Sequence, residues 1–122
     1  MSTVSDVMSS TPVTVSRATT VAEAATIMGE RRVGSALVME GDSLLGIFTE
    51  RDVLKALGEH FDAAGHPVSE WMTADPVTVP PDTDAAVALK TMLDGNFRHL
   101  PVVEGGRVVG VVSMRDVSAA QS

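Results

Sequence analysis

One short motif occurs twice in the sequence, and this duplication limits the fold more than any other feature. The first copy, GIFTERD, spans residues 46–52, and the second, GVVSMRD, spans residues 110–116, 64 positions later. Each copy ends an apolar run, passes through a hydroxyl residue and opens a segment whose apolar residues have helical spacing. The motif therefore predicts, twice in one chain, a strand that runs directly into the first turn of a helix.

Two explanations fit the hydroxyl and acidic residues of these junctions. Thr49 with Asp52, and Ser113 with Asp116, have the spacing of a capping box, which satisfies the free N–H groups of a helix and contributes about 1 kcal/mol. Alternatively, the same N–H groups and the positive end of the helix dipole form an anion site, to which the hydroxyl and carboxylate add hydrogen bonds. A phosphorylated ligand with a sugar diol would suit such a site. Both explanations stay open at this point.

The duplication extends over almost the whole chain. The sequence PVTV at residues 12–15 recurs unchanged at 76–79, and residues 4–8 are echoed by residues 68–72, at the same displacement of 64. The period is too long for a short-repeat solenoid and two copies are too few. A closed pair of repeats related by a pseudo-twofold axis is therefore expected.

Both repeats are predicted to contain the same series of elements. Thr20 and Glu23 form a capping box for the first long helix, and Gly95 with Asn96 is a C-terminal signal for its counterpart. The first repeat is predicted to have a strand at 12–15, a helix at 20–32, strands at 36–39 and 44–48, and a helix at 50–60. The second is predicted to have a strand at 76–79, a helix capped by Asp82, Thr83 or Asp84, a hairpin around 102–106, a strand at 107–112 and a helix after Ser113.

Length and composition indicate one soluble globular domain. The chain has 122 residues, of which 44% are hydrophobic. A half of about 55 residues alone would be marginally stable, so the two repeats are expected to share a core. No apolar run approaches 18 residues and no basic region precedes an apolar one at the start, so neither a spanning helix nor a signal peptide is expected. The expected location is the cytoplasm.

Charge and residue types argue against several classes of protein. The net charge of −7 disfavours a binder of duplex nucleic acid, which normally carries a basic stripe. The chain has no cysteine, and its three histidines, His60, His66 and His99, lack metal-ligand spacing, so no metal site is expected. Neither a nucleophile elbow nor a P-loop is present. We therefore expect no catalytic residues and no enzymatic activity.

The chain resembles a tandem pair of cystathionine beta-synthase (CBS) domains. The resemblance is carried by the two junctions, the paired PVTV segments and the run RHLPV at residues 98–102. It implies an α/β (α+β) fold in which two β-α-β-β-α repeats pack with pseudo-twofold symmetry into one module. The implied boundaries are residues 4–57 for the first repeat, 58–67 for a linker and 68–120 for the second repeat.

The resemblance also implies a function. CBS pairs are regulatory modules that sense adenosine-containing ligands such as AMP, ADP, ATP or S-adenosylmethionine in clefts between the two repeats, without a cofactor and without chemistry. They commonly form disc-shaped homodimers, and a regulated protein partner, unknown here, is implied. The alternative is a constitutive dimerisation or scaffolding module of the same fold that binds no nucleotide.

Residues matching the family pattern fall into two implied clefts. In the first cleft Asp116 would contact the ribose hydroxyls and Ser113 the phosphate, with positive charge from Arg98 and His99, while Thr11 and Val13 would enclose the base. The second cleft would use Asp52, Thr49, Asp75 and Val77. Met114 and Arg115 lie inside the second junction and are included among the candidate ligand contacts. The alternative for Arg115, which its place early in a helix favours, is that it faces water.

The two clefts are not expected to be equal. Arg98 and His99 align with Gly34 and Ser35 of the first repeat, which carry no charge. We therefore predict that the Asp116 cleft is the better phosphate site, and that the Asp52 cleft is weaker, empty or suited to a less charged adenosine compound. The alternatives for these two residues are a solvated helix-end cation for Arg98 and a packed strand residue for His99.

Overall fold

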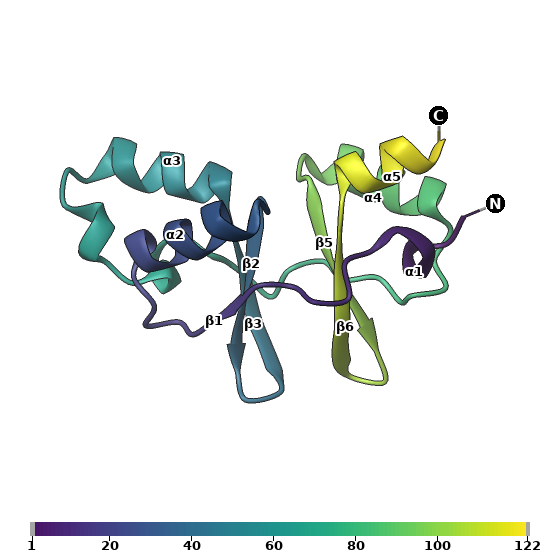
Figure 1. The fold of residues 1–122 in the computed structure, drawn as a ribbon, viewed down its shortest axis with the longest axis horizontal. Helices are drawn as coiled ribbons and strands as arrows, with labels where there is room; N and C mark the ends of the chain where they lie inside the picture. Colours follow the sequence, from purple (N-terminus) through teal and green to yellow (C-terminus); the bar gives the residue numbers. More distant parts are fainter. Residues whose placement is uncertain (1, 122) are drawn as a thin grey trace. The chain divides into compact units, whose positions relative to one another are not determined.

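A computed structural model describes residues 2–121 of the chain, which fold into two compact α/β units that do not coincide with the two sequence repeats (Figure 1). The central unit is Val13–Pro76. The terminal unit combines Met1–Pro12 with Val77–Ser122. The opening segment of each repeat therefore belongs to the unit that contains the body of the other repeat.

The central unit contains a four-stranded sheet in the order β1-β2-β3-β4. Strand β1 is parallel to β2, whereas the β2–β3 and β3–β4 pairs are antiparallel. Its elements are β1 (Thr14–Val15), α2 (Val21–Arg31), β2 (Ser35–Glu40), β3 (Ser43–Thr49), α3 (Glu50–Glu59), the 3-10 turns η1 (Ala63–Gly65) and η2 (Val68–Glu70), and β4 (Thr73–Ala74).

The terminal unit is built around an antiparallel pair of strands, β5 and β6. Its elements are α1 (Val4–Val7), α4 (Ala85–Gly95), β5 (His99–Glu104), β6 (Arg107–Ser113) and α5 (Met114–Gln121). The strand predicted at 76–79 is wrong in extent, because only Val79 pairs, in a parallel bridge with Val102. In the central unit the equivalent Thr14–Leu37 pair is held by the Leu37 N–H, which donates to the Val13 carbonyl oxygen at 2.8 Å, whereas the aligned Pro101 has no N–H to donate.

Helix ends agree with the capping signals in the sequence. The Thr20–Glu23 box is present, with Glu23 N–H donating to Thr20 Oγ1 at 3.1 Å and Thr20 N–H donating to Glu23 Oε1 at 2.9 Å. Asp84 caps α4, and the cap residues Arg32 and Asn96 end α2 and α4 in the left-handed conformation. Among residues 2–121, no helix has both the length and the apolar character that crossing a membrane requires.

Each unit has its own hydrophobic core, and each core uses residues from both repeats. Val4, from the first repeat, is fully buried in the core of the terminal unit with Leu100 and Val112. Val68, from the second repeat, is fully buried in the core of the central unit. The expectation of a shared core therefore takes the form of two cores, each completed by the opening segment of the other repeat.

The predicted linker at 58–67 is part of the packed central unit as well as a connection. It contains the last residues of α3 and the whole of η1. Ala63 is fully buried and belongs to the core of that unit. Composition does not distinguish this segment from a solvated linker, because a single small apolar residue, Ala63, packs it into the core.

Candidate functional site

The first candidate site is the corner where β6 meets α5 in the terminal unit. Ser113 ends the strand and Met114 begins the helix. The backbone N–H of Asp116 donates to Ser113 Oγ at 3.1 Å, and the backbone N–H of Ser113 donates to Asp116 Oδ2 at 3.3 Å. Both bonds of a capping box are therefore present, as the residue spacing predicts.

The equivalent corner joins β3 to α3 in the central unit. The backbone N–H and the hydroxyl of Thr49 donate to Asp52 Oδ2 at 2.9 and 3.2 Å, and the backbone N–H of Asp52 donates to Thr49 Oγ1 at 3.3 Å. Asp52 is partly buried. Loss of hydration raises the pKa of its carboxyl above the ordinary value, although the hydrogen bonds from Thr49 and the charges of Lys55 and Arg51 oppose that shift.

Capping and ligand binding can coexist at these corners. The capping bonds use Oδ2 of Asp52 and of Asp116. A carboxylate has two oxygens with about four acceptor positions. The same side chain can therefore cap its helix and accept hydroxyl groups from a sugar, so both explanations of the motif remain physically sound.

Strand register brings the predicted cations to the corner of the terminal unit. His99 lies directly opposite Ser113 in the β5–β6 ladder, and the backbone N–H of Met114 donates to the carbonyl oxygen of Arg98 at 2.8 Å. Arg98 is exposed and His99 is half-buried. Arg98, His99, Ser113 and Asp116 therefore come from the same end of one strand pair and the helix that follows it.

The central unit has the same backbone arrangement with different side chains. Ser35 lies opposite Thr49, and the backbone N–H of Glu50 donates to the carbonyl oxygen of Gly34 at 3.0 Å. Ser35 is buried, at 4% exposure, and Glu50 is exposed. The aligned positions of the two repeats are thus equivalent in space, and the charge difference that the sequence indicates is a difference between matching places.

Asp75 does not lie beside Thr49, with which it is grouped in the second implied cleft. Thr73 pairs with Ile47, and the backbone N–H of Asp75 donates to the carbonyl oxygen of Leu45 at 3.2 Å. Leu45 precedes Thr49 by four residues, a distance of about 13 Å along a strand. Asp75 is therefore placed beside the middle of β3 and does not adjoin the Thr49 corner.

The remaining predicted contacts lie in the opening segments. Thr11 is exposed in the terminal unit, two residues after Ser9, which pairs with Val111. Val13 is 4% exposed and packs in the core of the central unit, whereas Val77 is 52% exposed. The family pattern groups Val13 with Asp116 and Val77 with Asp52, residues that belong to different units. These two assignments stay predictions.

The glycine that begins each motif has a structural role that the sequence analysis missed. A Cβ added to Gly46 would lie 2.7 Å from the carbonyl oxygen of Thr73, and one added to Gly110 would lie 2.5 Å from that of Ser9. Met72 and Met8 also press against the two glycines. The recurrence of Gly at matching positions was the available signal: each marks the place where a segment of the other repeat crosses the strand.

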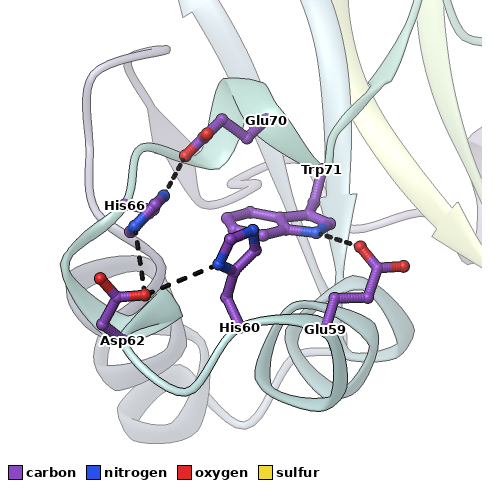
Figure 2. A network of polar contacts seen from close by, with 6 residues as sticks. All are labelled: Glu59, His60, Asp62, His66, Glu70 and Trp71. Atoms are coloured by element: carbon purple, nitrogen blue, oxygen red, sulfur yellow. Dashed lines mark hydrogen bonds and ion pairs between the residues drawn. The ribbon is translucent and has the colours of Figure 1, made fainter.

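A polar network in the central unit was also missed (Figure 2). His66 Nδ1 lies 2.6 Å from Glu70 Oε2, and His66 Nε2 lies 3.4 Å from Asp62 Oδ1, which is 3.7 Å from His60 Nδ1. The Trp71 indole N–H donates to Glu59 Oε1 at 3.0 Å. The spacing of four residues from Asp62 to His66 and from His66 to Glu70 was the signal. Within residues 2–121, no group of three His, Asp or Glu side chains is placed to hold a metal ion.

The strand–helix corner occurs twice in the same structural context, and comparison with known proteins explains why. A family model, CBS domain, matches residues 4–59 and 68–122. The chain belongs to the CBS domain family. This CBS pair is 41% identical over 103 residues to an uncharacterized 17.7 kDa protein of Acidianus ambivalens, covering 83% of the chain and 62% of that protein. It is 34% identical to the CBS domain-containing protein YhcV of Bacillus subtilis, covering 99% and 86%.

Length differs among the curated relatives of this CBS pair. A CBS domain-containing protein of Arabidopsis thaliana, CBSCBSPB5, is 43% identical over 103 residues, which are 83% of this chain and 19% of that protein. The chain thus spans 62% of the Acidianus protein and about a fifth of the plant protein. The similarity therefore covers only part of each of these two relatives.

Solved CBS structures share the fold. The CBS-domain containing protein ATU1752 from Agrobacterium tumefaciens has a TM-score of 0.94 at 32% identity, covering 99% of this chain and all of that one. The CBS domain pair of protein MJ0100, in complex with 5′-methylthioadenosine and S-adenosyl-L-methionine, has a TM-score of 0.89 at 28% identity, covering 99% and 100%. A CBS domain protein from Pyrobaculum aerophilum complexed with AMP has a TM-score of 0.85 at 31% identity, covering 94% and 89%.

Proposed function

We propose that this CBS pair is a regulatory module that binds adenosine-containing ligands at its two strand–helix corners and senses them without chemical transformation. The observation that carries the proposal is the corner of the terminal unit, where Asp116 and Ser113 lie at a helix N-terminus beside Arg98 and His99. Two solved relatives bind AMP, or 5′-methylthioadenosine with S-adenosylmethionine, and support this ligand class.

The chemistry of the terminal corner suits a nucleotide. Asp116 can accept both hydroxyls of a ribose, and each hydrogen bond to a charged group contributes about 1.5 to 3 kcal/mol before desolvation. The phosphate would lie near Ser113 and the start of α5, where the helix dipole favours an anion. Arg98, His99 and Arg115 would add positive charge, so AMP, ADP and ATP are the ligands we propose for this corner.

Calorimetric titration with AMP tests the proposal. Asp116→Ala should abolish AMP binding at the terminal corner and leave only the weaker binding of the central corner, because it removes the acceptor of the ribose hydroxyls. Asp6→Ala is a matched control: Asp6 accepts the Thr3 backbone N–H at 2.9 Å and so caps α1 in the same unit, with no proposed ligand role. Equal AMP affinity in the wild type and the Asp116→Ala variant would contradict the proposal.

A scaffolding role is the second candidate, and the capping geometry favours it. The hydrogen bonds at Thr49–Asp52 and Ser113–Asp116 are those of helix caps, which need no ligand. A thermal-shift panel separates the two functions, since a ligand at 100 times its Kd stabilises by about 2.7 kcal/mol. An unchanged Tm with AMP, ADP, ATP, S-adenosylmethionine and 5′-methylthioadenosine would favour the scaffold.

We also propose that the chain forms a homodimer in the cytoplasm and acts on a partner protein that is not yet identified. One face of α3 and the residue after its cap expose Leu54 at 75%, Leu57 at 52% and Phe61 at 100%. The spacing of three and four residues forms an apolar stripe, which favours association with another protein surface. Sedimentation of the wild type and of Leu54→Lys should show a dimer and a monomer, respectively.

A further inference from the structure

The two corners have the same backbone and different charges. We infer that Glu50 makes the corner of the central unit selective for adenosine compounds whose 5′ substituent has no net negative charge. The inference rests on the proposed function. It chooses the less charged adenosine compounds among the alternatives expected for the Asp52 corner and names a residue that determines this preference.

Hydrogen bonds establish that the differing side chains occupy matching places. The backbone N–H of Glu50 donates to the carbonyl oxygen of Gly34 at 3.0 Å, and the backbone N–H of Met114 donates to the carbonyl oxygen of Arg98 at 2.8 Å. In both units the donor is the first residue of the helix and directly follows the capping Thr or Ser. Glu50 therefore replaces Met114 at the start of the helix, and Gly34 replaces Arg98 beside it.

At these two aligned positions the exchange makes the central corner more negative than the terminal corner. The terminal corner gains a cation at Arg98 and has a neutral side chain at Met114, whereas the central corner has no side chain at Gly34 and an anion at Glu50. Arg51 and Arg115 occupy the same motif position in the two units and cancel in the comparison. The expectation of unequal clefts rested on the missing cation at Gly34 alone and did not include the anion at Glu50.

Lys55 is a cation of α3 whose aligned residue in the second repeat, Ala119, is neutral. It follows Asp52 by three residues, so it lies about one helical turn farther from the N-terminus of α3. Its charge acts on the Asp52 carboxylate, whose pKa it lowers. Lys55 therefore compensates the carboxylate that would hold the ribose, while the exposed Glu50 is the first residue of the helix at whose start a phosphate would lie.

Electrostatic repulsion determines which adenosine compounds the central corner prefers. A phosphate at the start of α3 would meet the helix dipole and the Glu50 carboxylate together, and the carboxylate opposes the dipole. An uncharged 5′-methylthio group suffers no such repulsion, and a sulfonium group is attracted. The ribose requirement is unchanged, because Thr49 and Asp52 reproduce the geometry of Ser113 and Asp116. The central corner thus retains sugar recognition and loses phosphate recognition.

The test isolates the central corner in an Asp116→Asn background, which preserves the side-chain shape and weakens ribose binding at the terminal corner by removing the charge and one of the two acceptor oxygens. Calorimetry with AMP and with 5′-methylthioadenosine gives the affinity ratio of the two probes. We expect the background protein to favour 5′-methylthioadenosine. Adding Glu50→Met should shift the ratio toward AMP by about fivefold, the effect of one unit charge near the ligand in water, and 1 M salt should reduce the shift.

A reciprocal variant serves as the matched control. Met114→Glu in an Asp52→Asn background should shift the ratio away from AMP by a similar factor. An unchanged ratio in both Glu50→Met and Met114→Glu would overturn the inference, while AMP binding by the wild type would leave the proposed function intact. Failure of the wild type to bind either probe would overturn both.

Discussion

The side chain of Asp52 accepts two hydrogen bonds from Thr49 through one oxygen: the backbone N–H at 2.9 Å and the hydroxyl at 3.2 Å. This arrangement holds a partly buried carboxylate at the start of α3. The two bonds favour the ionised form, but burial has the larger effect and raises the pKa of Asp52 above its ordinary value. The corner therefore carries a carboxylate whose ionisation is costly and which further hydroxyl donors would stabilise.

Removing the charge at Asp52 should change how stability depends on pH. Because the folded-state pKa is raised, the protonated carboxyl favours folding at pH values below the unfolded pKa, and this contribution is lost as pH rises through the folded pKa. The free energy of unfolding of the wild type, measured by denaturant titration relative to Asp52→Asn, should therefore fall as pH rises from about 3.9 toward neutrality. A rise over that interval would show that the hydrogen bonds outweigh burial.

Gly46→Ala and Gly110→Ala should each destabilise the protein by about 2 kcal/mol through overpacking. The new methyl groups would lie 2.7 and 2.5 Å from backbone oxygens, which cannot move away as a flexible side chain could. Thermal unfolding should show a Tm several degrees below that of the wild type for each variant. Gly58→Ala is the control: it lies in α3 with nothing within 4 Å of the added carbon, and should raise stability by about 0.5 to 1 kcal/mol.

His66 should titrate above its ordinary value. Its hydrogen bond to Glu70 is the main cause of the raised pKa, with a smaller contribution from Asp62. Stability from this interaction is complete below about pH 6.5 and is lost as pH rises through the folded-state pKa. NMR titration of the imidazole should show that Glu70→Gln lowers the pKa of His66, whereas Glu104→Gln in the terminal unit leaves it unchanged. Equal His66 titration in all three proteins would contradict the network.

Arg32→Gly should stabilise the protein by about 1 kcal/mol. Arg32 ends α2 with φ of 56°, a left-handed conformation that costs energy for a residue with a side chain and none for glycine. Arg31→Gly is the matched control one residue earlier, inside the helix, where glycine should destabilise by about 1 kcal/mol. Denaturant midpoints that move in the same direction for both variants would contradict this explanation.

Local features of this protein were predictable because the interactions that create them span three or four residues. The Thr20–Glu23, Thr49–Asp52 and Ser113–Asp116 boxes form within one helical turn. The carboxylate that caps each corner is therefore visible in the spacing alone. The strand at 76–79 was wrong for a different reason, since the alignment with 12–15 took no account of the partner strand, where Pro101 replaces Leu37 and lacks the backbone donor.

Features that depend on distant segments were not predictable in the same way. Pairing of Thr73 with Ile47, and of Ser9 with Val111, explains why Gly46 and Gly110 cannot carry a side chain. The network of His60, His66 and Trp71 requires the chain after α3 to fold back on that helix. A residue list shows which types are present, but hydrogen bonds and ring contacts arise only when these segments meet.

The sequence by itself determined the two repeats, their strand–helix corners, the caps and the charge difference between Arg98 and Gly34, because each is a local pattern or a direct comparison of aligned positions. Only the tertiary structure decided how the repeats are divided between units, with Val4 completing one core and Val68 the other. An apolar residue has the same local pattern whichever core it enters. Which core buries it depends on the packing of the whole chain.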